Sequence, residues 1–279
     1  MQDLKPLEPG VMFWAGRDDL VEMKSLGVRC GQLGIPGAMD LDESAAAVWR
    51  DALRREGFTL VTVFASYIGE SYADIPAVAR TVGFVPKKTR EERERRTRDL
   101  SDFAAALGVG SIACHIGCVP EDPGHPDYVA VREMVRRVCD HAGRRGQTFA
   151  LETGQERPEV LSRFLTAVDR PNVRINFDPA NMILYGTGEP IAALRALAPH
   201  VVSVHCKDAC GPPADVPGAL GTERPLGLGS VGIERFVQTL REIGFRGPLN
   251  IEREAENQQE RLSDIRQAVR LLTRLVGSG

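Results

Sequence analysis

The sequence predicts a single (β/α)8 TIM barrel spanning residues 1–279, and three observations support this fold class. Short apolar runs, typical of strands buried on both faces, alternate with longer amphipathic stretches. A glycine separates an amphipathic stretch from the next apolar run at Gly27, Gly57, Gly108, Gly146 and Gly244. Glycine is favoured just past a helix because it accepts the left-handed backbone conformation. Eight such units in strict alternation imply parallel strands joined by right-handed crossovers.

The apolar runs predict eight strands, at Val11–Ala15, Val28–Leu33, Leu60–Ala65, Ser111–Ile116, Thr148–Leu151, Val173–Phe177, Val201–His205 and Leu249–Glu252. The amphipathic stretches predict helices at Asp18–Leu26, Leu41–Glu56, Thr89–Leu107, Pro126–Arg145, Pro158–Val168, Pro190–Leu197, Ile233–Ile243 and Gln259–Leu275. An open, doubly wound sheet is the alternative arrangement. No Gly-x-Gly-x-x-Gly pattern follows the first strand to support it, so we favour the barrel.

Composition limits the class of protein. Of the 279 residues 43% are hydrophobic and 26% charged, which is enough for one large core in a single domain. The net charge of −3 argues against a nucleic-acid-binding surface. The six cysteines follow no disulfide framework, Met1–Gly10 is polar, and no run of about 18 apolar residues occurs. We therefore expect a cytoplasmic protein with reduced thiols, without nucleic-acid or membrane partners, and either monomeric or homo-oligomeric.

Three segments between the core elements stand out. The connections Ser66–Lys88 and Cys206–Gly232 are long and follow strands, so they lie on the face where barrel enzymes carry out chemistry. They either cover a substrate or are plain surface insertions. Thr89–Arg98 is a run of mixed charges with opposite signs four residues apart, which favours a solvated helix start over a binding patch.

Four apolar runs end in a residue that is costly to bury alone: Glu152, Asp178, His205 and Glu252. Because side chains alternate along a strand, these four are expected to converge at the carboxyl-terminal end of the barrel. Their charges would destabilise the fold unless a cation neutralises them. One nitrogen and three oxygen ligands suit a single divalent ion, Mn²⁺ first, and also fit Mg²⁺, Co²⁺, Zn²⁺ or Fe²⁺. The alternative is that each residue independently caps the following helix.

The strand ends resemble those of the sugar-phosphate isomerase/epimerase family, the xylose isomerase-like TIM barrels, over nearly the whole chain. The resemblance rests on four motifs in order: Leu151-Glu152, Phe177-Asp178-Pro179-Ala180-Asn181, His205-Cys206-Lys207-Asp208 and Ile251-Glu252-Arg253-Glu254. It implies that Glu152, Asp178, His205 and Glu252 bind the metal ion. It also implies that Glu152 and Glu252 form a catalytic acid–base pair.

The implied chemistry has a physical basis. A divalent ion polarises a carbonyl and its neighbouring hydroxyl, so the proton on the carbon between them becomes removable. One glutamate takes that proton and the other returns one, through a cis-enediolate. Return to the opposite face gives an epimer, and return to the neighbouring carbon gives an aldose–ketose isomer. The prediction is therefore a ketose 3-epimerase or aldose–ketose isomerase that acts on a small sugar or polyol-derived ketone.

Other residues near the strand ends are candidates for substrate contacts. Lys207 shares the inward face of His205 and either neutralises an oxyanion or phosphate of the substrate or pairs with Asp208 or a ligand carboxylate. His115 ends the fourth strand on its inward side. It either contacts the substrate or a metal ligand, or it is a core histidine. Trp14 forms an apolar wall for the sugar or belongs to the core.

Two positions depart from the family pattern. Asn181 stands where many relatives carry a histidine, so a substrate hydrogen bond there is expected to differ. In the loop Pro225–Gly232, relatives often carry acidic residues that this chain lacks. Glu223 and Arg224, just before that loop, are the residues expected to make these polar contacts instead.

Other functions fit parts of the pattern. A lyase or hydratase that acts on keto-sugars or keto-glycosides by β-elimination is the main alternative, because it begins with the same proton abstraction. A non-catalytic sugar-binding barrel is a remote one, since no ligand is missing. An endonuclease-IV-like enzyme would need a trinuclear zinc cluster, and only His115 and His205 of the five histidines lie at strand ends. The C-x3-C pairs Cys114–Cys118 and Cys206–Cys210 are expected to be buried thiols rather than metal ligands.

Overall fold

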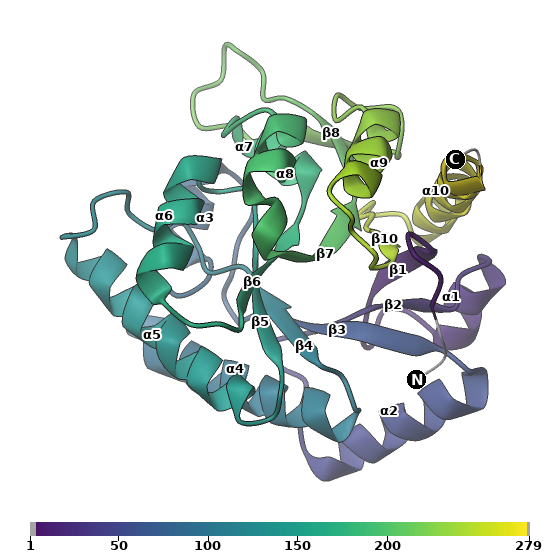
Figure 1. Ribbon diagram of the computed structural model, residues 1–279, viewed down its shortest axis with the longest axis horizontal. Helices are drawn as coiled ribbons and strands as arrows, with labels where there is room; N and C mark the ends of the chain where they lie inside the picture. The colour runs from purple at the N-terminus through teal and green to yellow at the C-terminus, as the bar shows by residue number, and fades with distance from the viewer. Residues whose placement is uncertain (1–3, 278–279) are drawn as a thin grey trace.

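The computed structural model describes residues 4–277, which form a closed barrel of eight parallel strands (Figure 1). Around the barrel the strands follow chain order, and the last pairs with the first through Val11 and Ile251. The strands are β1 (Pro9–Trp14), β2 (Cys30–Ile35), β3 (Thr59–Ala65), β4 (Ser111–Cys114), β5 (Thr148–Glu152), β6 (Val173–Phe177), β7 (Val201–Cys206) and β10 (Leu249–Ile251). This topology confirms the predicted barrel and excludes the doubly wound sheet.

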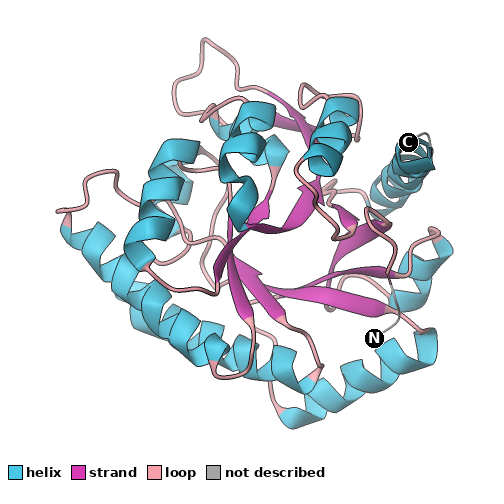
Figure 2. Cartoon of the chain, viewed as in Figure 1, coloured by secondary structure: helices cyan, strands magenta, loops and turns pink. Residues whose placement is uncertain are grey.

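Helices surround the barrel and cover its outer face (Figure 2). They are α1 (Leu20–Ser25), α2 (Glu43–Glu56), α3 (Ile75–Thr81), α4 (Arg90–Ala106), α5 (Pro126–Gly143), α6 (Pro158–Val168), α7 (Pro179–Tyr185), α8 (Pro190–Leu197), α9 (Ile233–Glu242) and α10 (Gln258–Gly277), with 3-10 turns η1 (Lys87–Thr89) and η2 (Ala198–His200). Within residues 4–277 none of these helices combines the length and the apolarity that a membrane span requires.

The predicted strands and helices are present, with ends that differ by a few residues. Two short helices and a two-stranded hairpin lie in segments where the sequence predicts loops. Helix α3 lies in the connection after β3, and α7 begins directly after Asp178, whose carboxylate accepts hydrogen bonds from Ala180 N and Asn181 N. The connection after β7 contains a small antiparallel hairpin, β8 (Asp208–Cys210) and β9 (Thr222–Arg224). Each element spans at most two helical turns or three residues, too short to produce a clear hydrophobic period.

Alternate strand residues face either the helices or the barrel axis. The outer layer holds the main core, where Phe13 meets Phe58 edge to face with ring centroids 5.6 Å apart. A smaller apolar cluster lies on the inner face and includes Met12 and Phe64. Buried polar side chains such as Gln32 share this interior.

The charge run at the start of α4 is less solvated than predicted. The i,i+4 pair Glu94–Arg98 is present, as the sequence indicates. Arg93, however, is only 3% exposed, and its Nη1 donates to Gly83 O at 2.5 Å. Its guanidinium lies 5.3 Å from the centre of the Tyr67 ring. This cation is therefore a structural link between α4 and the segment after β3, not part of a solvated face.

Candidate metal centre

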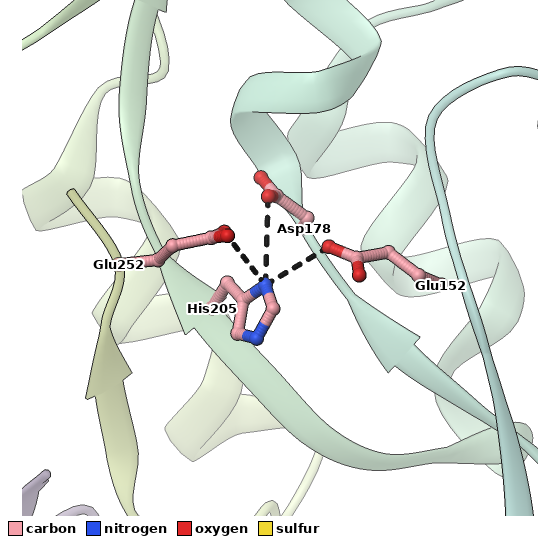
Figure 3. Close-up of side chains that lie close together, drawn as sticks. All are labelled: Glu152, Asp178, His205 and Glu252. Carbon is pink, nitrogen blue, oxygen red and sulfur yellow. Dashed lines mark hydrogen bonds and ion pairs between the residues drawn. The ribbon is translucent and has the colours of Figure 1, made fainter. Parts of the chain in front are cut away.

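Four strands bring Glu152, Asp178, His205 and Glu252 together at one end of the barrel, and we call these residues the carboxylate–histidine cluster. Each offers one ligand atom within 4.8 Å of the others. Figure 3 shows the three carboxylates pointing at the imidazole from different sides. His205 Nδ1 lies 2.9 Å from Glu152 Oε1, 2.9 Å from Glu252 Oε2 and 3.6 Å from Asp178 Oδ2. The structure thus gathers all four predicted ligands around one nitrogen.

Burial and charge act in opposite directions on this cluster. Burial raises the pKa of Asp178 to about 6, although Lys207 and His205 oppose the rise. For Glu252, the nearby His205 and Lys207 outweigh burial and hold its pKa well below the usual range. Burial lowers the pKa of His205, but Glu252 and Glu152 outweigh it and hold that pKa well above its usual value. Burial therefore decides the direction of the pKa shift for Asp178, whereas neighbouring charges decide it for Glu252 and His205.

The donor atoms fit a divalent cation. Asp178 Oδ2 is buried and has no hydrogen-bond partner among residues 4–277, while Oδ1 is used by the backbone of α7. His205 Nδ1 lies at equal distance from Glu152 and Glu252, so one proton on this nitrogen could not satisfy both carboxylates fully. The nitrogen and the three carboxylates would instead hold a divalent ion, since one nitrogen with three oxygens is a donor set suited to Mn²⁺ or Mg²⁺.

A cavity of about 460 Å³ opens beside the cluster and is reached from the face of the βα loops. Glu152 and Glu252 line it together with five of the predicted contact residues: Trp14, His115, Asn181, Lys207 and Glu223. Arg224 does not line it, and its side chain is exposed on β9. Along a β-strand neighbouring side chains point to opposite faces, so Glu223 turns inward and Arg224 outward. We call this space the central cavity.

The Lys207 ammonium lies on the cluster side of the central cavity. Its Nζ is 3.3 Å from Glu252 Oε2, 3.8 Å from Asp178 Oδ2 and 3.9 Å from Glu223 Oε2. Burial lowers the pKa of Lys207, but these carboxylates outweigh burial and hold it well above its usual value. Lys207 therefore stays charged in an enclosed site, where its field is strong.

His115 and Asn181 both contact Glu152. Asn181 Nδ2 donates to Glu152 Oε1 at 3.3 Å, and His115 Nε2 lies 3.4 Å from Oε2 of the same carboxylate. The other ring nitrogen of His115 faces Gln155 Nε2 at 2.9 Å. The two oxygens of Glu152 thus have different neighbours, one on the cluster side and one on the His115 side.

Trp14 lies at the rim of the central cavity. Its indole Nε1 donates to Glu254 Oε1 at 2.9 Å, and Arg17 Nη1 donates to Glu254 Oε2 at 2.7 Å. The Trp14 backbone N–H donates to Asp18, whose carboxylate forms a buried pair with Arg261 of α10. These bonds fix the indole against the cavity wall.

Sequence reasoning missed several residues at this site. Tyr72, in the loop before α3, and Tyr185, the last residue of α7, line the central cavity from segments that the sequence predicts only as connections. Asp208 is the clearest case: its carboxylate accepts from the N–H groups of Gly227, Gly229 and Val231 at 2.9–3.0 Å. A Cβ on Gly229 would lie 2.2 Å from Asp208 Oδ1, so glycine is required there. The glycine pattern of Pro225–Gly232 was the available signal for this anchor.

The cysteines do not contribute to the centre. Cys114 and Cys206 are buried and pack in the apolar layer between strands and helices. Burial raises the pKa of Cys118 to about 12, so this thiol is protonated near neutral pH. The cysteines that the structure describes are free, as the sequence predicts.

Comparison with known proteins adds family information to this geometry. The crystal structure of a xylose isomerase domain protein from Planctomyces limnophilus is 42% identical, with 97% of each chain covered and a TM-score of 0.93. A D-allulose 3-epimerase from Methylomonas sp. in complex with D-allulose is 17% identical, with 99% of this chain and 98% of that chain covered and a TM-score of 0.67.

A third structure, the probable 3-DHS dehydratase AsbF of Bacillus anthracis involved in petrobactin synthesis, is 16% identical. It covers 95% of this chain and 98% of its own, with a TM-score of 0.68. At these low identities the last two structures share the fold alone. A search of functionally curated proteins finds no match.

The family model described as xylose isomerase-like TIM barrel matches residues 20–275, a span that includes every member of the carboxylate–histidine cluster. The resemblance predicted from the strand-end motifs is thereby confirmed, and the chain belongs to the xylose isomerase-like TIM barrel family.

Proposed function

We propose that the protein is a divalent-metal-dependent sugar isomerase or epimerase in which Glu152 and Glu252 are the acid–base pair. The observation that carries this proposal is their placement. The two carboxylates come from β5 and from the end of β10, lie on either side of His205 Nδ1 at 2.9 Å, and both line the central cavity. A ketone held between them would have one carboxylate on each face.

The cluster supports one divalent ion, with Glu152, Asp178, His205 and Glu252 as its ligands. Mn²⁺ is the proposed ion, and Mg²⁺, Co²⁺, Zn²⁺ and Fe²⁺ suit the same donors. When bound, such an ion supplies Lewis-acid polarisation of a substrate carbonyl and its neighbouring hydroxyl.

The two glutamates have different electrostatic surroundings, which assigns their resting roles. Lys207 and His205 keep Glu252 ionised, so Glu252 is the base that removes the proton from the carbon next to the carbonyl. The C–H electron pair becomes the C=C bond of an enediolate, and the carbonyl pair moves onto oxygen. Glu152, which enters this direction of the reaction protonated, then gives its proton to the same carbon from the other side. The C=C electron pair forms the new C–H bond and the carbonyl re-forms. In the reverse direction the roles exchange.

Other cavity residues support substrate binding. The Lys207 ammonium is positioned to neutralise the oxygen that gains charge during enolisation. Trp14, together with Phe64 and Tyr72, offers an apolar wall for the carbon face of a sugar. The D-allulose complex of a structural neighbour supports a small sugar as the substrate class. The free cysteines support a reducing, cytoplasmic location.

Product analysis tests the proposal. Mn²⁺-loaded protein would be incubated with a panel of ketoses, aldoses and keto-sugars, and the products would be separated and identified by NMR. Formation of an epimer or isomer that requires the metal is the expected result. Absence of any epimer or isomer across the panel, from protein that binds Mn²⁺, would contradict it.

A metal-dependent lyase is the second candidate, because the dehydratase AsbF shares the fold and because elimination begins with the same proton abstraction. The same panel separates the two, since a lyase releases water or an alcohol from the carbon beyond the enediolate. A product with an added double bond would assign the protein to this second class.

A further inference from the structure

Three buried polar side chains from three strands form a chain inside the barrel that ends on the ligand His205. Gln32 of β2 places Oε1 2.7 Å from His205 Nε2. Gln32 Nε2 donates to Asn176 Oδ1 of β6 at 3.0 Å, and Ser203 Oγ of β7 donates to the same oxygen at 2.6 Å. Gln32 and Asn176 are fully buried. None of the three lines the central cavity.

We propose that Gln32 is a positioning residue that fixes the His205 tautomer for metal binding; this inference rests on the proposed metal centre. An amide oxygen only accepts, so it requires the proton on Nε2. A neutral imidazole with its proton on Nε2 presents the Nδ1 lone pair, and Nδ1 is the atom that faces the three carboxylates. Metal-binding histidines depend on such a partner for tautomer and ring orientation.

The direction of the hydrogen bonds among these side chains decides which nitrogen of His205 carries the proton. If the amide group of Gln32 were turned around, its Nε2 would donate to His205 Nε2 and the proton would move to Nδ1, where the metal ion belongs. Asn176 opposes that turn because its Oδ1 accepts from both Gln32 and Ser203. The Phe64 ring, with its centroid 5.7 Å from that of His205, lies against the imidazole on another side.

The polar chain has a cost that packing alone does not explain. Barrel interiors are normally filled by bulky branched apolar residues. Here Asn176 Nδ2 is buried without a hydrogen-bond partner in the described part of the chain. An unpaired buried donor is unfavourable, so an apolar set of the same shape would stabilise the barrel better. The polar side chains are explained by the proposed role of Gln32, which is to fix the tautomer of His205.

Mn²⁺ titration of the metal-free protein by calorimetry tests this role with two substitutions of opposite kind. Gln32→Met keeps the shape but removes the acceptor, and we expect Mn²⁺ affinity to fall by about 10- to 100-fold. Gln32→Glu keeps an acceptor for the Nε2 proton, so affinity should stay close to that of the wild type. Thr62→Val is the matched control, because Thr62 is a buried neighbour of Gln32 in register on β3.

A purely structural role predicts the opposite order, since the apolar Met would be tolerated and a buried Glu would not. Wild-type affinity in Gln32→Met, or equal losses in Gln32→Met and Gln32→Glu, would therefore overturn the inference. If Gln32→Met does not fold, long-range ¹H–¹⁵N NMR of the Mg²⁺-loaded wild type decides. We expect a proton on His205 Nε2, and an unprotonated Nε2 would refute the role.

These outcomes are distinct from failure of the proposed function. A wild type that binds Mn²⁺ but converts no sugar would refute the isomerase proposal and leave the Gln32 comparison intact. A wild type that binds no divalent ion would overturn both.

Discussion

Glu152 Oε1 and Glu252 Oε2 each lie 2.9 Å from the same nitrogen, Nδ1 of His205, and approach it from opposite sides (Figure 3). Their surroundings nevertheless differ. Glu252 has the Lys207 ammonium beside it, whereas Glu152 contacts the neutral donor Asn181 and the ring of His115. The unequal neighbours distinguish the two carboxylates and agree with the different roles proposed for them in proton transfer.

Asp178→Asn is expected to remove metal-dependent stabilisation while the fold is kept. The new side-chain oxygen can still cap α7, but the buried Oδ2 is replaced by a donor. Mn²⁺ at about 100-fold above its Kd should raise the free energy of unfolding of the wild type by about 2.7 kcal/mol. Urea unfolding with and without Mn²⁺ measures this difference. An equal gain in Asp178→Asn would argue against Asp178 as a ligand.

Lys207→Met is expected to lower kcat by about 10²-fold, because the charge that faces the developing oxyanion is lost. Steady-state kinetics on the substrate found in the panel measures the effect. Arg224→Met is the control, since Arg224 is exposed and outside the central cavity, and its kcat and KM should match those of the wild type. Equal losses of kcat in the two variants would mean that removing any positive charge lowers kcat, and that the position of Lys207 in the cavity is not the cause.

Glu156 makes stability depend on pH. Burial raises the pKa of Glu156 to about 7 from 4.5, although Val119 N donates to it. The folded state therefore favours the protonated form. This contribution is fully present below pH 4.5 and is lost as pH rises through 7.

Glu156→Gln should consequently stabilise the protein, compared with the wild type, more at pH 8 than at pH 4.5. The difference in the free energy of unfolding should be on the order of 2–4 kcal/mol. Urea unfolding at the two pH values checks the sign. Glu159→Gln, at a side chain 57% exposed, should show no comparable change. A parallel pH dependence in wild type and Glu156→Gln would show that this carboxyl is not the source.

The buried pair between Asp18 and Arg261 holds α10 to the loop that follows Trp14, the last residue of β1. Both side chains are fully buried, with Arg261 Nη1 at 2.6 Å from Asp18 Oδ1. Asp18→Asn leaves the guanidinium charge uncompensated, so we expect a loss of about 3–5 kcal/mol in urea unfolding. Asp102→Asn breaks a pair with His141 at the surface and should cost less than about 1 kcal/mol. Similar losses in both variants would mean that the burial of the first pair is unimportant.

The barrel and its four candidate ligands could be predicted because each depends on local pattern. Glu152 follows a buried apolar run at once, and a charged residue there is conspicuous in the sequence. Gln32 could not be found in this way, since its partner Asn176 is 144 residues distant and a single amide inside a strand gives no periodic signal. Short elements such as α7 are not predicted either, because seven residues are too few to give a periodic signal.

Two side chains lie otherwise than the sequence indicates, because a side chain's direction depends on tertiary structure. Arg224 follows Glu223 in the sequence, but the β8–β9 hairpin turns one toward the central cavity and the other to solvent. Arg93 lies in a run of charges, yet the packing of α4 against the segment after β3 buries it. Charge patterns along a helix predict its exposed face only when the neighbouring segments are known.

We propose that Glu152 and Glu252 act on opposite faces of one substrate. Deuterium incorporation from D₂O tests this in Glu152→Gln and Glu252→Gln on a substrate that the wild type epimerises. The reaction is stopped, Mn²⁺ is removed, and the deuterium is located by NMR. We expect Glu152→Gln to exchange the proton on the Glu252 face of the unreacted sugar still, while the epimer no longer forms. Glu252→Gln should show neither exchange nor epimer from that sugar. When the epimer is the starting sugar, Glu252→Gln should exchange its proton without converting it, and Glu152→Gln should show neither exchange nor conversion. Full epimerisation by either variant with metal bound would contradict the account.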